Sequence, residues 1–201
     1  MTISWYGEAC FLLEAGGVRI LTDPPSSDTG LAAPRLKADI LILSKPADVP
    51  GASSEAFVIT DPGEYEIKDV SVQGVSVPIK NKPHTVYLIE MDGIKIAHLG
   101  YLAEELSGEQ LEALKDPDII ILPVGGGDVL DTEAAAKVIK EVEPRLVVPS
   151  LFSVKGLKRK AAPLSEFMKE VSAKEQPQPK LTIKKKDLDP ETTKIFPLEQ
   201  I

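Results

Sequence analysis

Short apolar and alternating runs dominate the first hundred positions of the chain, with turn residues between them. Gly16-Gly17 and Asp92-Gly93 each separate two such runs. Two-residue connections of this composition are typical of β-hairpins, because they adopt the positive φ angles that the tight turn needs. The pattern therefore predicts two hairpins, with strands at residues 10–15 and 18–22 and at residues 86–91 and 94–98.

Between the hairpins, residues 66–78 alternate only in part. This stretch predicts one or two strands, with Gly74 as a bulge or bend, because glycine inside a strand often marks such an irregularity. The apolar run at residues 38–43 predicts a further strand directly before Ser44.

After residue 100 the pattern changes to helices alternating with buried strands. Ser107 and Gln110 fit a capping box, which opens a helix that reaches about residue 115. Pro163 starts another helix, whose apolar face we expect to close the core. The remaining predicted elements are a strand at 118–124, a helix at 132–142, a strand at 146–149 and, after the stiff spacer at 176–179, a last strand.

Strands first and strand–helix units later predict an α/β protein of the α+β type, in which helices cover sheets. The chain has 201 residues, of which 43% are hydrophobic, and this is enough to bury a core. A chain of this length predicts a single domain over residues 1–201.

Composition narrows the classes of partner. The formal net charge of -8 disfavours binding to a phosphate backbone, which depends on Lys and Arg replacing counterions, so we expect no nucleic-acid partner. No run reaches the ~20 apolar residues that a membrane span needs, so we expect no membrane contact and a cytoplasmic protein. The one cysteine, Cys10, excludes an intramolecular disulfide and a Cys-rich metal site.

Five stretches stand out as motifs: Trp5-Tyr6-Gly7-Glu8-Ala9-Cys10-Phe11, Ile20-Leu21-Thr22-Asp23-Pro24, Asp61-Pro62-Gly63-Glu64-Tyr65-Glu66-Ile67, Ala97-His98-Leu99-Gly100-Tyr101 and Val147-Val148-Pro149-Ser150-Leu151. With the tail at residues 180–188, they resemble the metallo-β-lactamase fold superfamily. The resemblance is to its bacterial branch of stand-alone zinc-dependent hydrolase-like proteins, near the ascorbate-phosphate lactonases. It covers essentially the whole chain.

The resemblance implies an αββα four-layer sandwich and a hydrolase that binds two zinc ions. The main zinc-binding run of that family, Ser/Thr-His-x-His-x-Asp-His, follows the strand that we predict at 38–43. Here Lys45, Ala47, Val49 and Pro50 stand at the four ligand positions. Zinc accepts thiolate, imidazole or carboxylate groups, and none of these side chains offers one at neutral pH. The zinc-ligand motif is thus degenerate, and we predict no metal ligand and no zinc cofactor.

Three other motif positions also differ from the family pattern. Glu8 replaces a histidine of the opening motif, Tyr101 replaces the metal-bridging aspartate, and Leu151 stands where the last histidine belongs. The metal-bound water that the family uses for hydrolysis depends on those ligands.

Lys45 allows two interpretations. Its ammonium stands at a position where the family binds a dication, so it could hold an anionic ligand without a metal. Alternatively, Lys45 points to solvent on a loop, and we favour this interpretation. Pro46 and Pro50 fix their backbone φ angles, which indicates a stiff loop.

His98 is the centre of a second candidate cluster. Carboxylates gathered in a cleft shift one another's pKa values, and they can carry out acid–base chemistry or hold a hard cation such as Mg²⁺ or Ca²⁺. The catalytic candidates are His98, Asp61 and Glu64, and the ligand-binding candidates are Lys45, Glu8, Asp23, Tyr101 and His98.

Structural roles are the alternatives for the same residues, and we favour them. A lone His98 at a strand end is typically hydrogen-bonded and structural. Asp23 and Asp61 each precede a proline, which predicts turns in which the carboxylates cap local backbone donors.

Three further features have simple structural explanations. Gly125-Gly126-Gly127 lacks the other residues of a phosphate-binding loop and predicts a tight strand-to-helix turn. Cys10 is expected to be a small core residue and not a reactive thiol. The basic runs at 155–160 and 184–186 predict solvated faces, with weak binding to an acidic partner as the alternative.

Three hypotheses of function follow. The first is a catalytically degenerate, non-enzymatic protein that binds a small anion or acts through assembly, with homo-oligomers implied by analogy with relatives. The second is a residual hydrolase of phosphoesters or lactones, built on Glu8, Asp23, Asp61, Glu64 and His98, with or without a hard metal ion. A third is an inert structural subunit beside an active paralogue.

Overall fold

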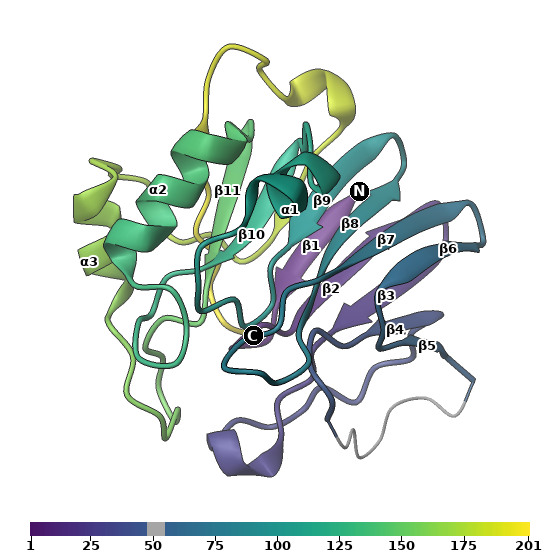
Figure 1. The fold of residues 1–201 in the computed structure, drawn as a ribbon, viewed down its shortest axis with the longest axis horizontal. Helices are drawn as coiled ribbons and strands as arrows, with labels where there is room; N and C mark the ends of the chain where they lie inside the picture. The colour runs from purple at the N-terminus through teal and green to yellow at the C-terminus, as the bar shows by residue number, and fades with distance from the viewer. Residues whose placement is uncertain (48–54) are drawn as a thin grey trace.

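The computed structural model describes residues 1–47 and 55–201, which form two β-sheets. One sheet consists of β1 (Thr2–Trp5), β2 (Phe11–Ala15), β3 (Val18–Thr22), β4 (Ile40–Ile42), β5 (Phe57–Ile59) and β12 (Leu181–Thr182). The other consists of β6 (Gly63–Ile67), β7 (Val70–Ser76), β8 (Thr85–Met91), β9 (Ile94–His98), β10 (Ile119–Pro123), β11 (Leu146–Ser150) and β13 (Lys194–Ile195). The strand orders are β12-β1-β2-β3-β4-β5 and β13-β11-β10-β9-β8-β7-β6 (Figure 1).

Both predicted hairpins are confirmed. β2 and β3 pair antiparallel around Gly16 and Gly17, and β8 and β9 pair antiparallel around Asp92 and Gly93. All four turn residues have positive φ angles, between 54° and 81°. These are the angles that a two-residue hairpin turn requires, so the turn chemistry sets the register of both hairpins.

Three α-helices lie in the described part of the chain: α1 (Gly108–Ala113), α2 (Thr132–Val142) and α3 (Leu164–Glu170), with 3₁₀ turns η1 (Ser27–Thr29) and η2 (Lys185–Asp187). The predicted capping box opens α1. Gln110 N donates to Ser107 Oγ (3.3 Å), and Ser107 N donates to Gln110 Oε1 (2.8 Å). None of the described helices has the length and apolar character of a membrane span.

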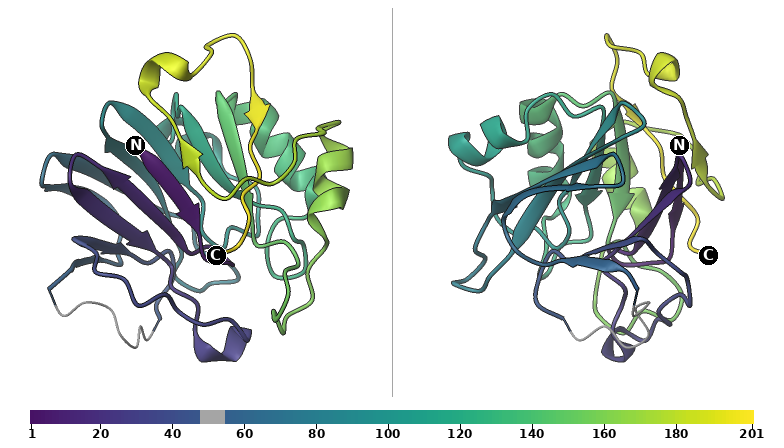
Figure 2. Two further views of the ribbon diagram at one scale, coloured as in Figure 1. Left: turned by 180° about the vertical axis from the view of Figure 1, so that it is seen from behind. Right: turned by 90° about the vertical axis from the view of Figure 1, so that its right-hand side faces the viewer.

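The two sheets face each other (Figure 2). One large cluster of buried apolar side chains draws on both of them. Leu13 and Ile40 of the six-stranded sheet are fully buried in it, as are Ile89, Ile121 and Val147 of the seven-stranded sheet. Burial of apolar surface stabilises a fold by about 25 cal/mol per Å². The mixed α/β class with two packed sheets is therefore confirmed, and the cluster between the sheets fixes the strand ends that carry the candidate site.

The prediction that Gly74 forms a bulge is wrong. Gly74 stands in unbroken register between Gly63 on β6 and Tyr87 on β8. A Cβ atom at this position would lie 3.0 Å from the carbonyl oxygen of Asp61 and 3.0 Å from the Tyr87 ring. Close approach of a neighbouring segment, and not a break in the ladder, therefore explains the glycine.

Asp118 joins three segments at the start of β10. Its carboxylate is buried and accepts hydrogen bonds from Lys95 N (2.9 Å), Arg145 Nη1 (2.8 Å) and Lys185 Nζ. Lys185 belongs to the solvated face predicted at residues 184–186, since it is exposed, and its ammonium also reaches this buried carboxylate. The contact ties the C-terminal segment to the seven-stranded sheet.

We expect Asp118→Ala to lower the free energy of unfolding by about 2–4 kcal/mol, because it leaves a buried backbone N–H and two cations without their acceptor. Urea denaturation followed by circular dichroism measures this loss. Asp69→Asn in an exposed turn is the matched control and should stay within about 0.5 kcal/mol of the original protein. Equal stability of the two variants would contradict the role of Asp118.

Candidate functional site

A cavity of about 260 Å³ lies among the loops that follow several strands of both sheets. In the seven-stranded sheet, these strands are β9, β10 and β11, which run parallel, so their carboxyl ends meet at one edge. Such an edge is the usual place for a ligand site in parallel sheets. The residues that line the cavity are Glu8, Ser26, Asp28, Thr29, Lys45, Tyr101, Asp128, Val129 and Arg159.

Lys45 lines this cavity and is also exposed to solvent. Its Nζ lies 3.3 Å from the centroid of the Tyr101 ring, within the range of a cation–π interaction. Part of the Lys45 side chain is exposed, but burial around the ammonium lowers its pKa, while the carboxylates of Asp23 and Glu8 act in the opposite direction. Lys45 is thus an exposed loop residue, as the favoured interpretation has it, and its ammonium also lies against the wall of the cavity.

Tyr101 forms a wall of the cavity. Its ring packs on the buried cluster of Ala9, Val129 and Leu151. Burial raises the pKa of the Tyr101 phenol well above its usual value, so the phenol stays neutral at neutral pH. The ring therefore offers Lys45 a π-face and not a negative charge.

Glu8 is buried and pairs with Arg159, a residue that we did not single out in the sequence. Arg159 Nε donates to both carboxylate oxygens of Glu8, at 2.9 and 3.1 Å, and Arg159 Nη2 donates to the carbonyl of Leu151. The prediction of a solvated face at residues 155–160 is wrong for Arg159. No sequence pattern signals this pair, because 151 positions separate its members.

Backbone conformation at the two partners of Arg159 is unusual. Glu8 and Leu151 both have left-handed backbones, with φ angles of 51° and 58°. The left-handed region of φ and ψ costs conformational free energy for any residue with a Cβ atom, most of all for a large side chain such as leucine. Contacts from neighbouring segments must therefore hold both residues in place, and Arg159 supplies one such contact to each.

Asp23 and His98 form a buried pair beneath the cavity. His98 Nε2 lies 2.7 Å from Asp23 Oδ2, while Asp23 Oδ1 accepts hydrogen bonds from Ser44 N (2.7 Å) and Ser44 Oγ (2.9 Å). The favoured turn role of Asp23 is wrong, because its carboxylate joins β4 and β9 and caps no local donor. His98 is hydrogen-bonded and fully buried, and its Nδ1 has no partner among the described residues.

Asp61 and Glu64 lie apart from this pair. Both are exposed, and Asp61 lines a different cavity of about 340 Å³ together with His84. The Asp61 carboxylate accepts a hydrogen bond from Thr60 Oγ1 (2.7 Å) and no local backbone donor, so its predicted capping role is also wrong. The structure thus brings Asp23 and His98 together, brings Glu8, Lys45 and Tyr101 to one cavity, and leaves Asp61 and Glu64 outside both groups.

The glycine run and Cys10 have the structural roles that we predicted. A Cβ atom on Gly125 would lie 1.9 Å from the carbonyl oxygen of Leu151, and Gly126 and Gly127 have φ angles of 68° and 74°. The run is a tight turn that only glycine can form here. Cys10 is fully buried, and burial raises the pKa of its thiol, so it is not a reactive nucleophile.

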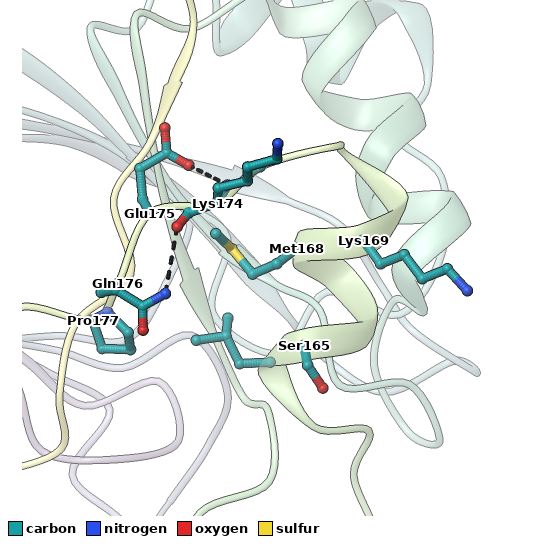
Figure 3. A pocket seen from close by; sticks show the side chains of 9 residues that line it. Ser165, Met168, Lys169, Lys174, Glu175, Gln176 and Pro177 are labelled. Atoms are coloured by element: carbon teal, nitrogen blue, oxygen red, sulfur yellow. Dashed lines mark hydrogen bonds between the residues drawn. The ribbon is translucent and has the colours of Figure 1, made fainter.

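A third cavity, of about 350 Å³, is lined by residues of α3, among them Met168, and by the segment at 173–177 (Figure 3). The hydrogen bonds drawn there are local, from Lys174 N to Glu175 Oε2 (2.9 Å) and from Gln176 Nε2 to the Lys174 carbonyl (3.4 Å). None of the residues singled out as site candidates lines this cavity. The candidate site is therefore the first cavity.

The side chains at the family's zinc-ligand positions do not fit a zinc ion. Lys45 presents an ammonium and Tyr101 a neutral phenol, neither of which is a ligand that zinc favours. Val49 and Pro50 lie outside the described residues, so the structure says nothing of them. Within residues 1–47 and 55–201, no three His, Cys, Asp or Glu side chains are placed together as a metal site.

Comparison with known proteins identifies the family. The profile of the Beta-lactamase superfamily domain matches residues 2–150. A UPF0173 protein from Pyrococcus furiosus is 26% identical, over 94% of this chain and 97% of its own length. A UPF0173 metal-dependent hydrolase from Thermoplasma acidophilum is 25% identical, over 79% of this chain and 86% of its own.

Solved structures agree with this assignment. A metallo-beta-lactamase superfamily protein from Thermotoga maritima superposes with a TM-score of 0.84 at 28% identity, covering 98% of this chain and 97% of its own. Igni18, a metallo hydrolase from Ignicoccus hospitalis, superposes with a TM-score of 0.66 at 20% identity, covering 91% and 99%, which supports the fold alone. The chain therefore belongs to the beta-lactamase superfamily and has the metallo-β-lactamase fold.

Proposed function

We propose that this chain is a non-catalytic member of its family that binds a small anionic molecule in the cavity at Lys45. The observation that carries the proposal is the position of the Lys45 ammonium. It lies at the cavity wall, against the Tyr101 ring, and makes no ion pair with any described residue. Ammonium groups have three donors, so a ligand carboxylate or phosphate can satisfy them.

The other charges at the cavity are already matched or exposed. Arg159 pairs with Glu8, and the exposed Asp128 lies 4.0 Å from Lys80. Asp28 is exposed in η1. Lys45 is thus the cation best placed to accept an incoming anion, and its partly buried setting strengthens such a contact relative to one in bulk water.

Donor chemistry supports the non-catalytic part of the proposal. Some relatives are named metal-dependent hydrolases, and zinc hydrolysis needs a metal that lowers the pKa of bound water. The side chains of Lys45 and Tyr101 do not supply metal ligands. The competing hydrolase built on carboxylates and His98 has less support, because Asp61 and Glu64 lie apart from the Asp23–His98 pair.

Assembly belongs to the same proposal. Homo-oligomers, implied by analogy with relatives, are the other way in which a non-catalytic member could act, and a cytoplasmic location is expected from the sequence. Light scattering coupled to size exclusion measures the mass in solution, and a monomer at every concentration would remove the assembly component while leaving the cavity as the binding site.

We expect Lys45→Met to weaken anion binding by about tenfold or more, because a charge-assisted hydrogen bond contributes roughly 1.5–3 kcal/mol. Calorimetric titration with acetate and with inorganic phosphate measures the affinity. Lys37→Met removes an exposed lysine elsewhere and is the control for net charge. Absence of binding to the original protein, or equal affinity in Lys45→Met, would refute the site.

Anion affinity should also fall as pH rises. The protonated amine binds the anion, and the pKa of Lys45 lies below that of an ordinary lysine because of burial. The decline in acetate affinity should therefore begin at a lower pH than the usual lysine value of about 10.4 implies. Titrations between pH 7 and 10 measure it. Lys45→Arg, which stays charged, should flatten the decline, and a constant affinity in the original protein would contradict the assignment.

Protein purified without chelators should carry well below one equivalent of zinc per chain, since the donor set does not fit the ion. Elemental analysis by mass spectrometry measures the content. Added zinc should leave the hydrolysis of phosphoester and lactone substrates at the background rate. Stoichiometric metal that disappears in His98→Asn would instead favour the residual hydrolase.

A further inference from the structure

We propose that Arg159 is the positioning residue of this site, and that its guanidinium organises the cleft around a fixed positive charge. Arg159 contacts positions at which this chain departs from the family motifs. Its Nε binds Glu8, which replaces a motif histidine, and its Nη2 binds the carbonyl of Leu151, which stands at the place of the last histidine. One side chain thus joins two loops that are distant in sequence.

Charge explains why a cation is needed at this point. Glu8 is 2% exposed, and an ionised carboxylate removed from water is costly unless a cation and hydrogen bonds compensate it. Among the described residues, Arg159 is the cation that pairs with Glu8. The guanidinium also suits the geometry, because its planar fork can bind a carboxylate and a carbonyl together, which a compact ammonium does less well.

Further contacts lead from Arg159 to the wall of the cavity. The neighbouring Lys158 N donates to the carbonyl of Thr29 (2.8 Å). Gly30 lies so close to this segment that a Cβ atom on it would be 2.3 Å from the carbonyl oxygen of Gly156. Because Thr29 lines the cavity, the segment that Arg159 holds in place also holds η1, which forms one wall.

This role differs from that of Lys45. Lys45 makes no ion pair within residues 1–47 and 55–201 and lines the ligand space, whereas Nε and Nη2 of Arg159 are occupied by protein acceptors. Arg159 therefore acts on the ligand through the shape of the cavity. The role holds whether or not the cavity takes an anion, so its failure and that of the proposed anion binding are separable.

Hydrogen exchange on the full chain tests the idea. In Arg159→Met, we expect the amides of Lys158 and Gly30 to exchange at least ~10-fold faster, since local opening sets their protection. The melting temperature should fall by about 5–10 °C. Lys155→Met, an exposed lysine in the same segment, is the matched control and should change neither readout. Unchanged protection in Arg159→Met would overturn the assignment.

Two further measurements keep the test informative if Arg159→Met folds poorly. Glu8→Gln keeps the size of the side chain and removes its charge, and its combination with Arg159→Met should lower the melting temperature by less than the sum of the single losses. Additive losses would overturn the pairing. Treatment of the original protein with a chelator should leave the melting temperature unchanged, and a clear fall would show that a metal, and not Arg159, organises the cleft.

Discussion

The need to compensate buried carboxylates governs this structure. Glu8, Asp23 and Asp118 are 2%, 4% and 2% exposed, so each must receive donors from within the protein. Each solves the problem differently. Glu8 uses a guanidinium, Asp23 uses a serine and an imidazole, and Asp118 uses a backbone amide with two cations. In every case the donor comes from a segment far away in the sequence, so each carboxylate connects parts of the fold.

These connections explain how the cleft keeps its shape although its residues do not fit a zinc ion. The paired strands and the apolar cluster between the sheets place the loops at one edge. The polar residues then fix the details. Asp23 and His98 join β4 and β9, while Arg159 joins two loops that line the cavity. Lys45 lines the same cavity and makes no ion pair with any described residue.

Much of the fold could be predicted from the sequence because its signals are local. The turn residues at Gly16-Gly17 and the capping box at Ser107 act on their own neighbours, and both are found as predicted. The site could be predicted only in part. The motifs predicted that Glu8, Lys45 and Tyr101 belong to one ligand-binding site. Arg159 was predicted only as part of a basic run on a solvated face. Its role depends on a partner that local patterns do not reveal. The prediction of a bulge at Gly74 was wrong for a related reason. Glycine is needed there because Asp61 and Tyr87, from neighbouring segments, leave no room for a Cβ atom.

The Glu8–Arg159 pair has an evolutionary consequence. A histidine at position 8, as in the family motif, would leave the guanidinium of Arg159 without its carboxylate partner. Loss of Arg159 alone would leave the buried carboxylate of Glu8 without a compensating cation. Each single change therefore costs folding free energy that the matched pair does not, so the two positions depend on each other and the residue at one limits what the other can accept.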